Sequence, residues 1–545
     1  MDVLISILAF IFALGLIICI HEGGHFFFAR RANVLCREFA FGMGPQIIKK
    51  KKGETTYSLR AFPIGGFCAI AGEEEELDPL VNLKKVRLEI VDGVVKKFYI
   101  DAKNPLFNDI KAYELVSYDI FDANDTGNLF VEVKDEDNPD SIVTYKVDPQ
   151  AMFVLAKDEI QIAPHNRTLN AKSKRARAMI MFGGPMMNFV LALVVFLVAG
   201  LIKGFPNQKS SVLGSVSENT PASAVNMQAG DEIKAFIIDE QYYEINSWSD
   251  LESFMATYSK THYNSNLKVS YSRDGVNHEV TINPELTSYG LGGIGFYQND
   301  LGQVVCNYHY LDEKSASEYV KSFENIDAYK AGLRIDHIIV KVDDTDITCL
   351  QDLYNVFINN IKGDEMKIYV DGQDEAIVVK PYSQSILKAS ANLNEESIPL
   401  AKITLGVSPT YKFNFGRSFV YSGKMTIKSC SAIVNTLRLL FTGGIGLKNL
   451  GGFVAIFSYT SNAAKSGFTT LLNWIGLLSV NIGIMNLLPI PALDGGRLVF
   501  VAYEAVTKKK PNPKVETILI TVTMILLFGL MIVVTFNDII RLIRG

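Results

Sequence analysis

The distribution of apolar residues divides the chain into four long hydrophobic segments separated by more polar sequence. The four segments occupy residues 3–29, 178–202, 471–491 and 518–536. Each is close to the roughly 20 apolar residues that a helix needs to cross a bilayer. The first segment lacks the basic start and the small-residue cleavage site of a secretory signal, so we expect it to be retained. The sequence therefore predicts a multi-pass α-helical membrane protein with about four transmembrane helices.

The polar region between the first two segments has the two-residue alternation of β-strands. VRLEIVDGVVKKFYI, around Asp92-Gly93, and LFVEVKDEDNPDSIVTYKV, at 129–147, each contain two alternating runs joined by turn residues. These patterns predict hairpins, and hence a small β-rich insertion. Its acidic run, Glu73 to Glu76, is most simply interpreted as a solvated face.

An internal duplication lies between the second and third hydrophobic segments. PASAVNMQAGDEI at 221–233 is similar to DAYKAGLRIDHII at 327–339, and strand-like sequence and a helix follow each copy. The pattern resembles tandem PDZ domains, which capture extended segments by strand addition or act as a size filter for substrates. The second copy has Asp336-His337 where the first has Gly230-Asp231. This difference puts the geometry of the second loop in doubt.

Composition agrees with a mixture of membrane and water-exposed parts. The mean hydropathy is +0.17, yet 20% of the 545 residues are charged. The net charge of −5 gives no basic surface for nucleic acid. The six cysteines form no CxxC pair and no disulfide-like framework, so we expect free thiols.

Lysine and arginine residues beside the hydrophobic segments predict the orientation of the chain. Basic clusters follow the first segment, precede the second and follow the third. If all of them lie in the cytoplasm, residues 30–177 are largely cytoplasmic and the duplicated region is extracytoplasmic. The carboxyl ends of the first and third segments then reach the same side of the membrane, where their side chains can meet.

The first hydrophobic segment ends in His-Glu-Gly-Gly-His, from His21 to His25. Ionisable groups are expensive at membrane depth and usually mark a working site. On a helix, His21 and His25 lie on one face and can bind one metal ion, while Glu22 projects beside them. Zn²⁺ lowers the pKa of a bound water to about 7, and a glutamate accepts the proton as that water attacks a carbonyl group. This spacing therefore predicts a zinc hydrolase.

The third segment supplies the expected third ligand. It ends NLLPIPALDGG, where Pro489 and Pro491 interrupt the helix and Asp494 follows. We expect Asp494 to complete the zinc site. Asn486 could hydrogen-bond a substrate carbonyl, and a role in holding helices together is equally compatible with its position.

HEGGH and NLLPIPALDGG resemble the HExGH and NxxPxPxLDG signatures of the site-2 protease family, the zinc intramembrane metalloproteases, and within it the bacterial RseP type. FAFGMGP, AFPIGGF and FGGPMMNF, beginning at Phe39, Ala61 and Phe182, are similar to further glycine-rich elements of that family, in the same order. The resemblance implies that Thr56 to Ala71 forms a sheet re-entering the membrane, whose edge near Gly65 and Gly66 pairs with substrate. A hairpin that only plugs the cavity is the alternative. For Asn188, in the second segment, we expect helix packing.

The resemblance also implies the activity, partners and location. We expect an intramembrane zinc metalloendopeptidase of the bacterial inner membrane, which cleaves single-span proteins such as pre-trimmed anti-sigma factors or remnant signal peptides. The expected parts are the first transmembrane helix with the re-entrant element at 1–72, the insertion at 73–170, the second helix at 171–203, PDZ-like domains at 204–298 and 299–410, amphipathic helices at 411–468, and the last two transmembrane helices at 469–545.

Two other classes of function compete with this prediction. A catalytically silent membrane scaffold would use its PDZ domains to sequester exported peptides, but would not need all four chemical residues. A zinc-dependent transporter would be expected to have an inverted repeat, which the four segments lack. The remaining histidines have no metal-ligand spacing, and we expect surface or hydrogen-bonded side chains at His165, His262, His278, His309 and His337.

Overall fold

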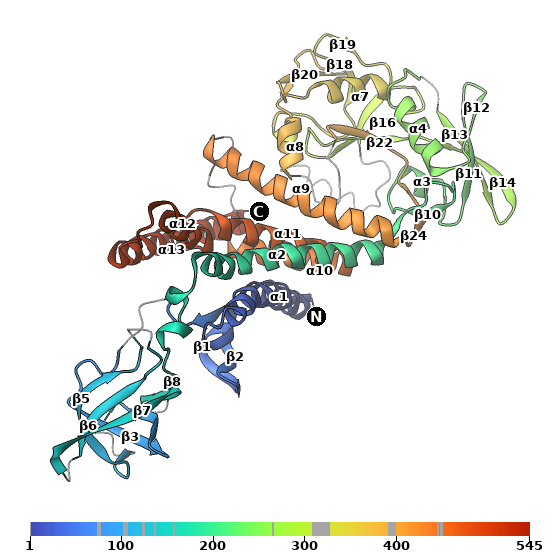
Figure 1. Cartoon of the computed structure of the whole chain (residues 1–545). Coiled ribbons are helices and arrows are strands. Elements are labelled where there is room, and N and C mark those ends of the chain that lie inside the picture. The colour runs from blue at the N-terminus through green and yellow to red at the C-terminus, as the bar shows by residue number, and fades with distance from the viewer. Residues whose placement is uncertain are drawn as a thin grey trace. The chain divides into compact units, whose positions relative to one another are not determined.

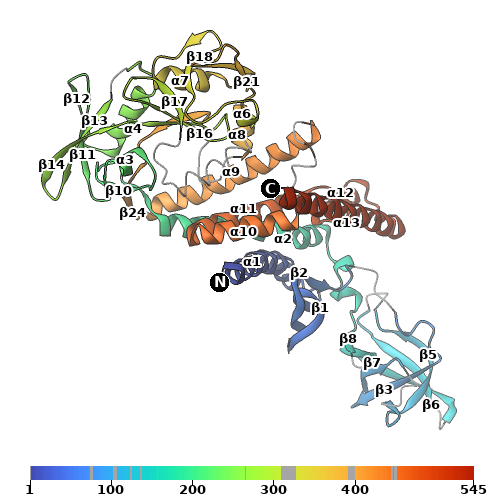
Figure 2. The same cartoon turned by 180° about the vertical axis from the view of Figure 1, so that it is seen from behind.

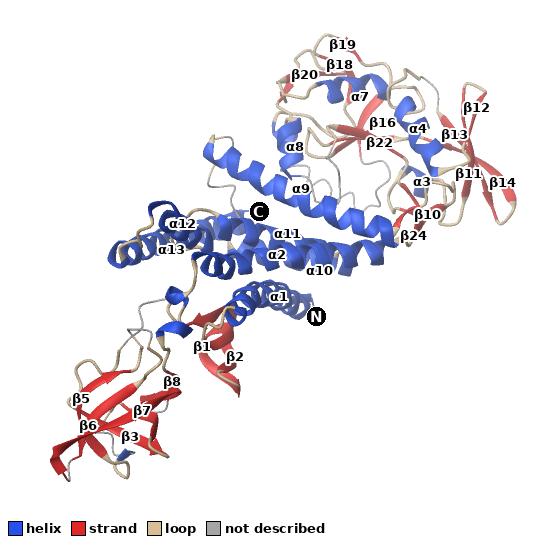
Figure 3. Cartoon of the chain, viewed as in Figure 1, coloured by secondary structure: helices blue, strands red, loops and turns tan. Residues whose placement is uncertain are grey.

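The computed structural model describes residues 2–73, 78–101, 107–122, 126–135, 138–155, 158–263, 266–307, 327–390, 399–443, 446 and 451–544. The chain forms two compact units. The first comprises Met1–Phe196 and Ser422–Gly545, and the second is Leu197–Tyr421. The first unit consists of long helices together with a β-hairpin and a small β-barrel. The second unit consists mainly of β-strands with short helices (Figures 1 and 3).

Among the described residues, four helices are long and apolar enough to cross a membrane, as the sequence predicts. They are α1 (Asp2–Arg31), α2 (Lys174–Lys203), α11 (Phe468–Leu487) and α13 (Pro513–Arg544). The prediction that the third span continues to residue 491 is wrong. Leu488 has an extended backbone because the ring of Pro489 disfavours helical geometry in the preceding residue.

Three shorter or more polar helices complete the helical part: α9 (Phe415–Phe441), α10 (Phe453–Lys465) and α12 (Asp494–Thr507). The ring of Phe10 in α1 packs edge-on against Phe453 and Phe457 of α10. Asp538 of α13 accepts backbone hydrogen bonds from Gly452 and Ala455 and so caps the start of α10. Helices α2, α10 and α11 lie side by side in both views (Figures 1 and 2).

Glycines allow the membrane helices to approach closely. A Cβ atom on Gly24 of α1 would overlap with the backbone of Gly183 in α2. On α11, a Cβ atom on Gly476 would lie 2.6 Å from the ring of Phe196 in α2. Small residues at helix crossings are a common means of packing in membranes, where van der Waals contact replaces the hydrophobic effect.

An antiparallel hairpin of β1 (Cys36–Lys52) and β2 (Thr55–Ile70) follows α1. The sequence predicted sheet at 56–71, and the partner strand is the segment that contains the glycine-rich FAFGMGP. The register shifts repeatedly between Cys36 and Ile48, so the hairpin is irregular beside α1 and regular near its turn.

Residues 85–161 form a small β-barrel. Its strands are β3 (Lys85–Val91), β4 (Val94–Tyr99), β5 (Ala112–Asp119), β6 (Phe130–Asp135), β7 (Asn138–Leu155) and β8 (Asp158–Gln161). Neighbouring strands pair antiparallel in the order β4-β3-β5-β6-β7-β8, and a parallel pairing of β4 with β7 closes the sheet. Phe98, Val95 and Val131 are fully buried in its core.

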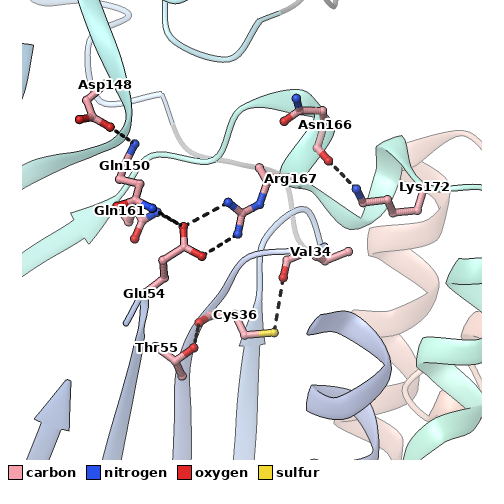
Figure 4. Close-up of polar contacts among 10 residues, drawn as sticks. All are labelled: Val34, Cys36, Glu54, Thr55, Asp148, Gln150, Gln161, Asn166, Arg167 and Lys172. Carbon is pink, nitrogen blue, oxygen red and sulfur yellow. Dashed lines mark hydrogen bonds and ion pairs between the residues drawn. The ribbon is translucent and has the colours of Figure 1, made fainter. Parts of the chain in front are cut away.

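Glu54, at the turn of the β1–β2 hairpin, connects the hairpin to the barrel (Figure 4). Its carboxylate accepts two hydrogen bonds from Arg167, at 2.7 and 3.1 Å, and one from Gln161 at 3.0 Å. The Arg167 guanidinium lowers the pKa of Glu54. Arg167 lies in the short helix η2 (His165–Arg167), before η3 (Leu169–Ala171), at the exit of the insertion.

The two ends of the insertion are joined through the backbone. The amide of Leu169, after the barrel, donates to the carbonyl of Ala71, before it, at 2.8 Å. Ala71 in turn donates to Leu35, and Leu35 to Arg167, both at 2.9 Å. The chain thus enters the insertion at Ala71 and leaves it at Leu169, two residues that lie side by side.

Among its described residues, the second unit contains two larger sheets and two further strand pairs, β10 with β23 and β9 with β24. The bounds of its strands are β9 (Phe205–Pro206), β10 (Leu213–Val216), β11 (Glu232–Ile238), β12 (Gln241–Glu244), β13 (Leu267–Arg273), β14 (Val276–Ile282), β15 (Glu285–Ser288), β16 (Ile294–Gln298), β17 (Val304–Asn307), β18 (Ile338–Val342), β19 (Thr345–Asp346), β20 (Met366–Val370), β21 (Ile377–Val379), β22 (Ala401–Thr404), β23 (Val407–Pro409) and β24 (Tyr411–Lys412). Its helices are α3 (Pro221–Ala224), α4 (Trp248–Tyr258), α6 (Asp327–Lys330), α7 (Leu350–Asn359) and α8 (Gln384–Ser390).

The boundary predicted between residues 298 and 299 falls inside one of these sheets. The first sheet has the order β12-β11-β13-β14, and the second runs β21-β20-β18-β17-β16-β15-β22 with β19 beside β18. Strand β16, assigned to the first copy, pairs with β17, where Phe296 lies opposite Cys306. The division between the sheets therefore lies between β14 and β15. The pairing of β15 with β22, which is distant in sequence, could not be predicted from the local pattern.

Buried apolar side chains of both copies form one continuous core, which includes Phe236, Trp248, Phe296 and Leu353. The loop whose geometry the sequence put in doubt has a left-handed backbone in both copies. Gly230 has φ +97° and Asp336 has φ +67°. Aspartate adopts this conformation more readily than most residues, so the exchange preserves the turn.

Candidate active site

His21, His25 and Asp494 lie together in the first unit. The Nε2 atoms of His21 and His25 are 3.2 and 3.4 Å from the same oxygen, Oδ2 of Asp494. The two Nε2 atoms are 3.3 Å apart. Both histidines are buried, and Asp494 comes from a position 469 residues after His25 in the chain (494 − 25). Two rings from α1 and one carboxylate from the start of α12 thus point at a single position.

The turn before α12 places the carboxylate. Ile490 donates to Leu488 at 2.7 Å and Leu493 donates to Ile490 at 2.9 Å, which bends the chain sharply after α11. A Cβ atom on Gly495 or Gly496 would overlap with backbone atoms of this turn. The two prolines end α11 and the two glycines allow the chain to fold back, so that Asp494 becomes the first residue of the next helix.

The other nitrogen of each histidine has a partner of its own. Nδ1 of His25 lies 2.8 Å from the carbonyl oxygen of Ile180, to which it donates. Nδ1 of His21 lies 3.1 Å from the amide of Asn188. A proton on Nδ1 leaves the lone pair of each ring on Nε2, which faces Asp494. The contact with Ile180 therefore holds the His25 ring in the tautomer that binds metal through Nε2.

The side chain of Asn188 contacts the His21 ring, whereas the sequence predicted only a role in helix packing. Its Oδ1 atom is buried and has no hydrogen-bond partner, while Nδ2 faces the ring of His21. A 180° rotation of the amide places Oδ1 where it accepts the Nδ1 proton of His21. Its backbone carbonyl also accepts from Ser479 of α11 at 2.8 Å, so Asn188 serves both packing and orientation.

Glycines in α2 make room for the two rings. A Cβ atom on Gly184 would overlap with Nε2 of His25 and crowd the ring of His21. Gly183 and Gly24 let the backbones of α1 and α2 touch at the same level. Gly23, by contrast, has open space beside it. The glycines of HEGGH are thus unequal: only the second is required by packing.

The arrangement fits a metal ion. Oδ2 of Asp494 is a buried carboxylate oxygen without a hydrogen-bond partner, which is costly unless a cation compensates it. The three ligand atoms all lie within 4.8 Å of one another. Two imidazole nitrogens and one carboxylate oxygen are a typical donor set for Zn²⁺ at a catalytic site with an open fourth position.

Glu22 lies between this cluster and the β1–β2 hairpin. Its carboxylate accepts a hydrogen bond from the backbone N–H of Cys68 in β2. A Cβ atom on Gly66 would lie 3.6 Å from Cγ of Glu22, whereas Gly65 faces Met43 across the hairpin. Gly66 therefore borders the candidate base, and Gly65 does not. The Asn486 amide nitrogen lies 3.5 Å from Nε2 of His21, which places Asn486 at the edge of the cluster.

Charged pairs outside the ligand set hold the same elements together. Glu73, which follows β2, pairs with Arg497 of α12 at 2.9 Å. The interpretation of Glu73 as part of a solvated acidic face is therefore wrong, and residues 74–76 of that run lie outside the described residues. Arg177 of α2 pairs with Glu504 of α12. Neither pair could be found from sequence spacing, because each joins distant segments.

Comparison with known proteins adds independent evidence. The family model described as Peptidase family M50 matches residues 9–530. The chain belongs to peptidase family M50. This M50 chain is 30% identical over 540 residues to the zinc metalloprotease RasP of Oceanobacillus iheyensis, an alignment that covers 98% of the chain and 99% of the relative.

Two further relatives extend the likeness of the M50 chain. It is 29% identical over 545 residues to the putative zinc metalloprotease SAR1238 of Staphylococcus aureus, with 99% of each protein covered. It is 28% identical over 540 residues to the zinc metalloprotease RasP of Shouchella clausii, covering 98% of the chain and 99% of the relative. The M50 chain is a zinc metalloprotease and an integral membrane protein, as the sequence motifs predicted.

Proposed function

We propose that this protein hydrolyses a peptide bond within or beside the transmembrane helix of a partner protein. The observation that carries the proposal is the convergence of His21, His25 and Asp494 on one position beside membrane-length helices. Ionisable groups inside a membrane usually mark a working site, so we infer that the substrate is itself in the membrane. A silent scaffold has no need for a buried carboxylate oxygen without a partner.

In this proposal each residue has one task. His21, His25 and Asp494 hold Zn²⁺ through Nε2, Nε2 and Oδ2. When bound, Zn²⁺ supplies Lewis acidity, which polarises the carbonyl group and makes a coordinated water acidic enough to attack near neutral pH. Glu22 would accept a proton from the attacking water and deliver it to the leaving amine. Asn188 and the carbonyl of Ile180 hold the two rings in orientation.

The β1–β2 hairpin would hold the substrate. A helical peptide bond is shielded by its own hydrogen bonds, so cleavage requires local unwinding, and strand addition gives the freed groups partners. Strands β1 and β2 form a two-stranded sheet, and Gly66 borders Glu22. A substrate segment beside Gly65 and Gly66 would lie next to the base. Asn486, whose amide nitrogen lies 3.5 Å from Nε2 of His21, would donate to the carbonyl group under attack.

The remaining parts fit the same proposal. The substrates would be single-span proteins, such as pre-trimmed anti-sigma factors or remnant signal peptides, in a bacterial inner membrane. Residues 30–177, including the barrel, would be cytoplasmic, and the duplicated unit would act as extracytoplasmic PDZ-like domains. In the first copy, β12 is the edge strand of its sheet and borders a cavity of about 360 Å³ with α4, which suits an extended peptide.

The test compares the full chain and its Glu22→Gln variant, both reconstituted in lipid vesicles with a single-span substrate. We expect cleavage to fall by about 10²–10⁴-fold, the usual contribution of a general base. Mass spectrometry of the products locates the cleaved bond, and metal analysis checks that the variant keeps its zinc. Equal cleavage by both proteins, or a cut far from the transmembrane segment, would reject the proposal.

A further inference from the structure

A second group of metal-ligand side chains lies in the duplicated unit. His262 follows α4 in the first copy, and Cys349 and Asp352 lie at the start of α7 in the second. Nδ1 of His262 is 3.4 Å from Sγ of Cys349 and 3.0 Å from Oδ1 of Asp352. All three ligand atoms lie within 4.8 Å of one another. The sequence gives no metal-ligand spacing here, because 87 and 90 residues separate His262 from its two partners.

Helix capping explains the contact between Cys349 and Asp352, which form a capping box at the start of α7, but it does not explain the presence of His262 or the choice of cysteine. In the first copy, Ser247 is the N-cap of α4, and its hydroxyl accepts a hydrogen bond from Asp250. The second copy keeps the aspartate, as Asp352, but has Cys349 at the N-cap. Oxygen side chains are the preferred N-caps, and sulfur is a weak acceptor. The cysteine is therefore a poorer cap than serine, but a much better ligand for a soft or borderline metal.

The directions of the contacts suit a cation rather than a proton relay. In a cysteine-based catalytic triad, the thiol and the carboxylate face different nitrogens of the histidine. Here both face Nδ1. The other carboxylate oxygen, Oδ2 of Asp352, accepts hydrogen bonds from the amides of Thr348 and Cys349, at 3.0 and 3.1 Å. This leaves Oδ1 as the oxygen directed at the imidazole and the sulfur.

The burial of the three groups also fits an ion bound between the copies. Cys349 is fully buried, the Asp352 side chain is 19% exposed, and that of His262 is 54% exposed. Cys349 and Asp352 are thus held in place by α7, whereas His262 is accessible to solvent. Beside them, the amide of Asn355 in α7 donates to the carbonyl of Lys260 at 3.3 Å, so the two copies are in direct contact here.

We propose that His262, Cys349 and Asp352 form a second zinc site, which fastens the first copy of the duplicated unit to the second. A thiolate, an imidazole and a carboxylate suit Zn²⁺ and other borderline divalent ions, and exclude Mg²⁺ and Ca²⁺ as preferred occupants. Solvent supplies the fourth ligand on the side of His262. Binding displaces the thiol proton of Cys349 to solvent. The site does not depend on the proposed peptidase chemistry.

The test uses the full chain, purified in detergent and loaded with Co²⁺ in place of zinc. A thiolate bound to Co²⁺ absorbs in the near ultraviolet, whereas the His21, His25 and Asp494 cluster contains no sulfur and gives no such band. We expect the band in the unmodified chain, and its loss in Cys349→Ser and His262→Gln. Each variant should also contain one zinc ion fewer per chain than the unmodified protein.

Matched variants control for the remaining cysteines and histidines. Cys306→Ser changes another buried thiol of the same unit, and His278→Gln changes another exposed histidine, and both should keep the band. His262 is exposed, so His262→Gln tests the site even if Cys349→Ser fails to fold. Absence of the band, or a band and zinc content unchanged in His262→Gln, would overturn the proposal and reduce the cluster to a hydrogen-bonded contact.

Discussion

The two clusters of metal-ligand side chains differ in how completely the protein positions them. In the membrane cluster, Nδ1 of each histidine is engaged by Ile180 or Asn188, so the rings are oriented by neighbouring helices. In the cluster of the duplicated unit, Asp352 is held by the start of α7, while His262 is half exposed on a loop. The first site is preorganised, as catalysis requires, and the second would be completed by the metal itself.

Removing one carboxylate from each cluster gives the largest expected contrast. Asp494→Asn should abolish proteolysis, because the only charged ligand of the membrane cluster is lost and the buried turn that carries it remains. Asp352→Asn should leave proteolysis nearly unchanged while lowering zinc content. Cleavage of a single-span substrate and zinc per chain measure the two effects. Loss of proteolysis in Asp352→Asn alone would show that the two clusters are not separate in function.

The partner of His21 provides the next contrast. Asn188→Leu should reduce zinc affinity or proteolysis by about 10–100-fold, as is typical when the group that orients a metal-bound histidine is removed. Asn188→Asp keeps an oxygen that can accept the Nδ1 proton, and should recover much of the loss. Zinc affinity is measured by competition with a chelator. An equal loss in both variants would assign the Asn188 side chain to helix packing rather than to orientation of the His21 ring.

The smallest effect concerns the two glycines of HEGGH. Gly24→Ala introduces a methyl group against the Gly183 backbone, and should destabilise the helical part by about 1–3 kcal/mol, the usual cost of overpacking. Gly23→Ala faces open space and should be neutral or slightly stabilising. Thermal unfolding of both variants in the same detergent measures the difference. Similar melting temperatures for Gly24→Ala and Gly23→Ala would mean that α1 and α2 can move apart at little cost. The membrane cluster would then be less rigidly held than we infer, and would differ less from the cluster that contains His262.

Local sequence was sufficient for much of the architecture. Hydropathy located four membrane-length helices, since lipid demands about 20 apolar residues whatever the tertiary structure. Alternation around Asp92-Gly93 located the turn between β3 and β4. The spacing of His21 and His25, and the prolines and glycines around Asp494, pointed to the three residues that the structure brings together.

Non-local contacts account for what the sequence could not predict. Asn188 in an apolar span has the same local pattern whether it packs helices or orients a ring. Strand β15 follows the first copy in sequence but pairs with β22, more than 100 residues later, and no local pattern records that choice. Glu73 lies in an acidic run, and only folding brings Arg497 beside it. His262 lacks any partner nearby in sequence, so its neighbours became visible only when both copies were folded.

The backbone bond from Leu169 to Ala71 has a consequence for how this protein could have acquired its present form. Because the two ends of the insertion are hydrogen-bonded to each other, the segment between them can change in length without moving α1 and α2 apart. The barrel itself contacts the hairpin through Gln161, which donates to Glu54 and accepts from Arg37, so this position constrains its sequence.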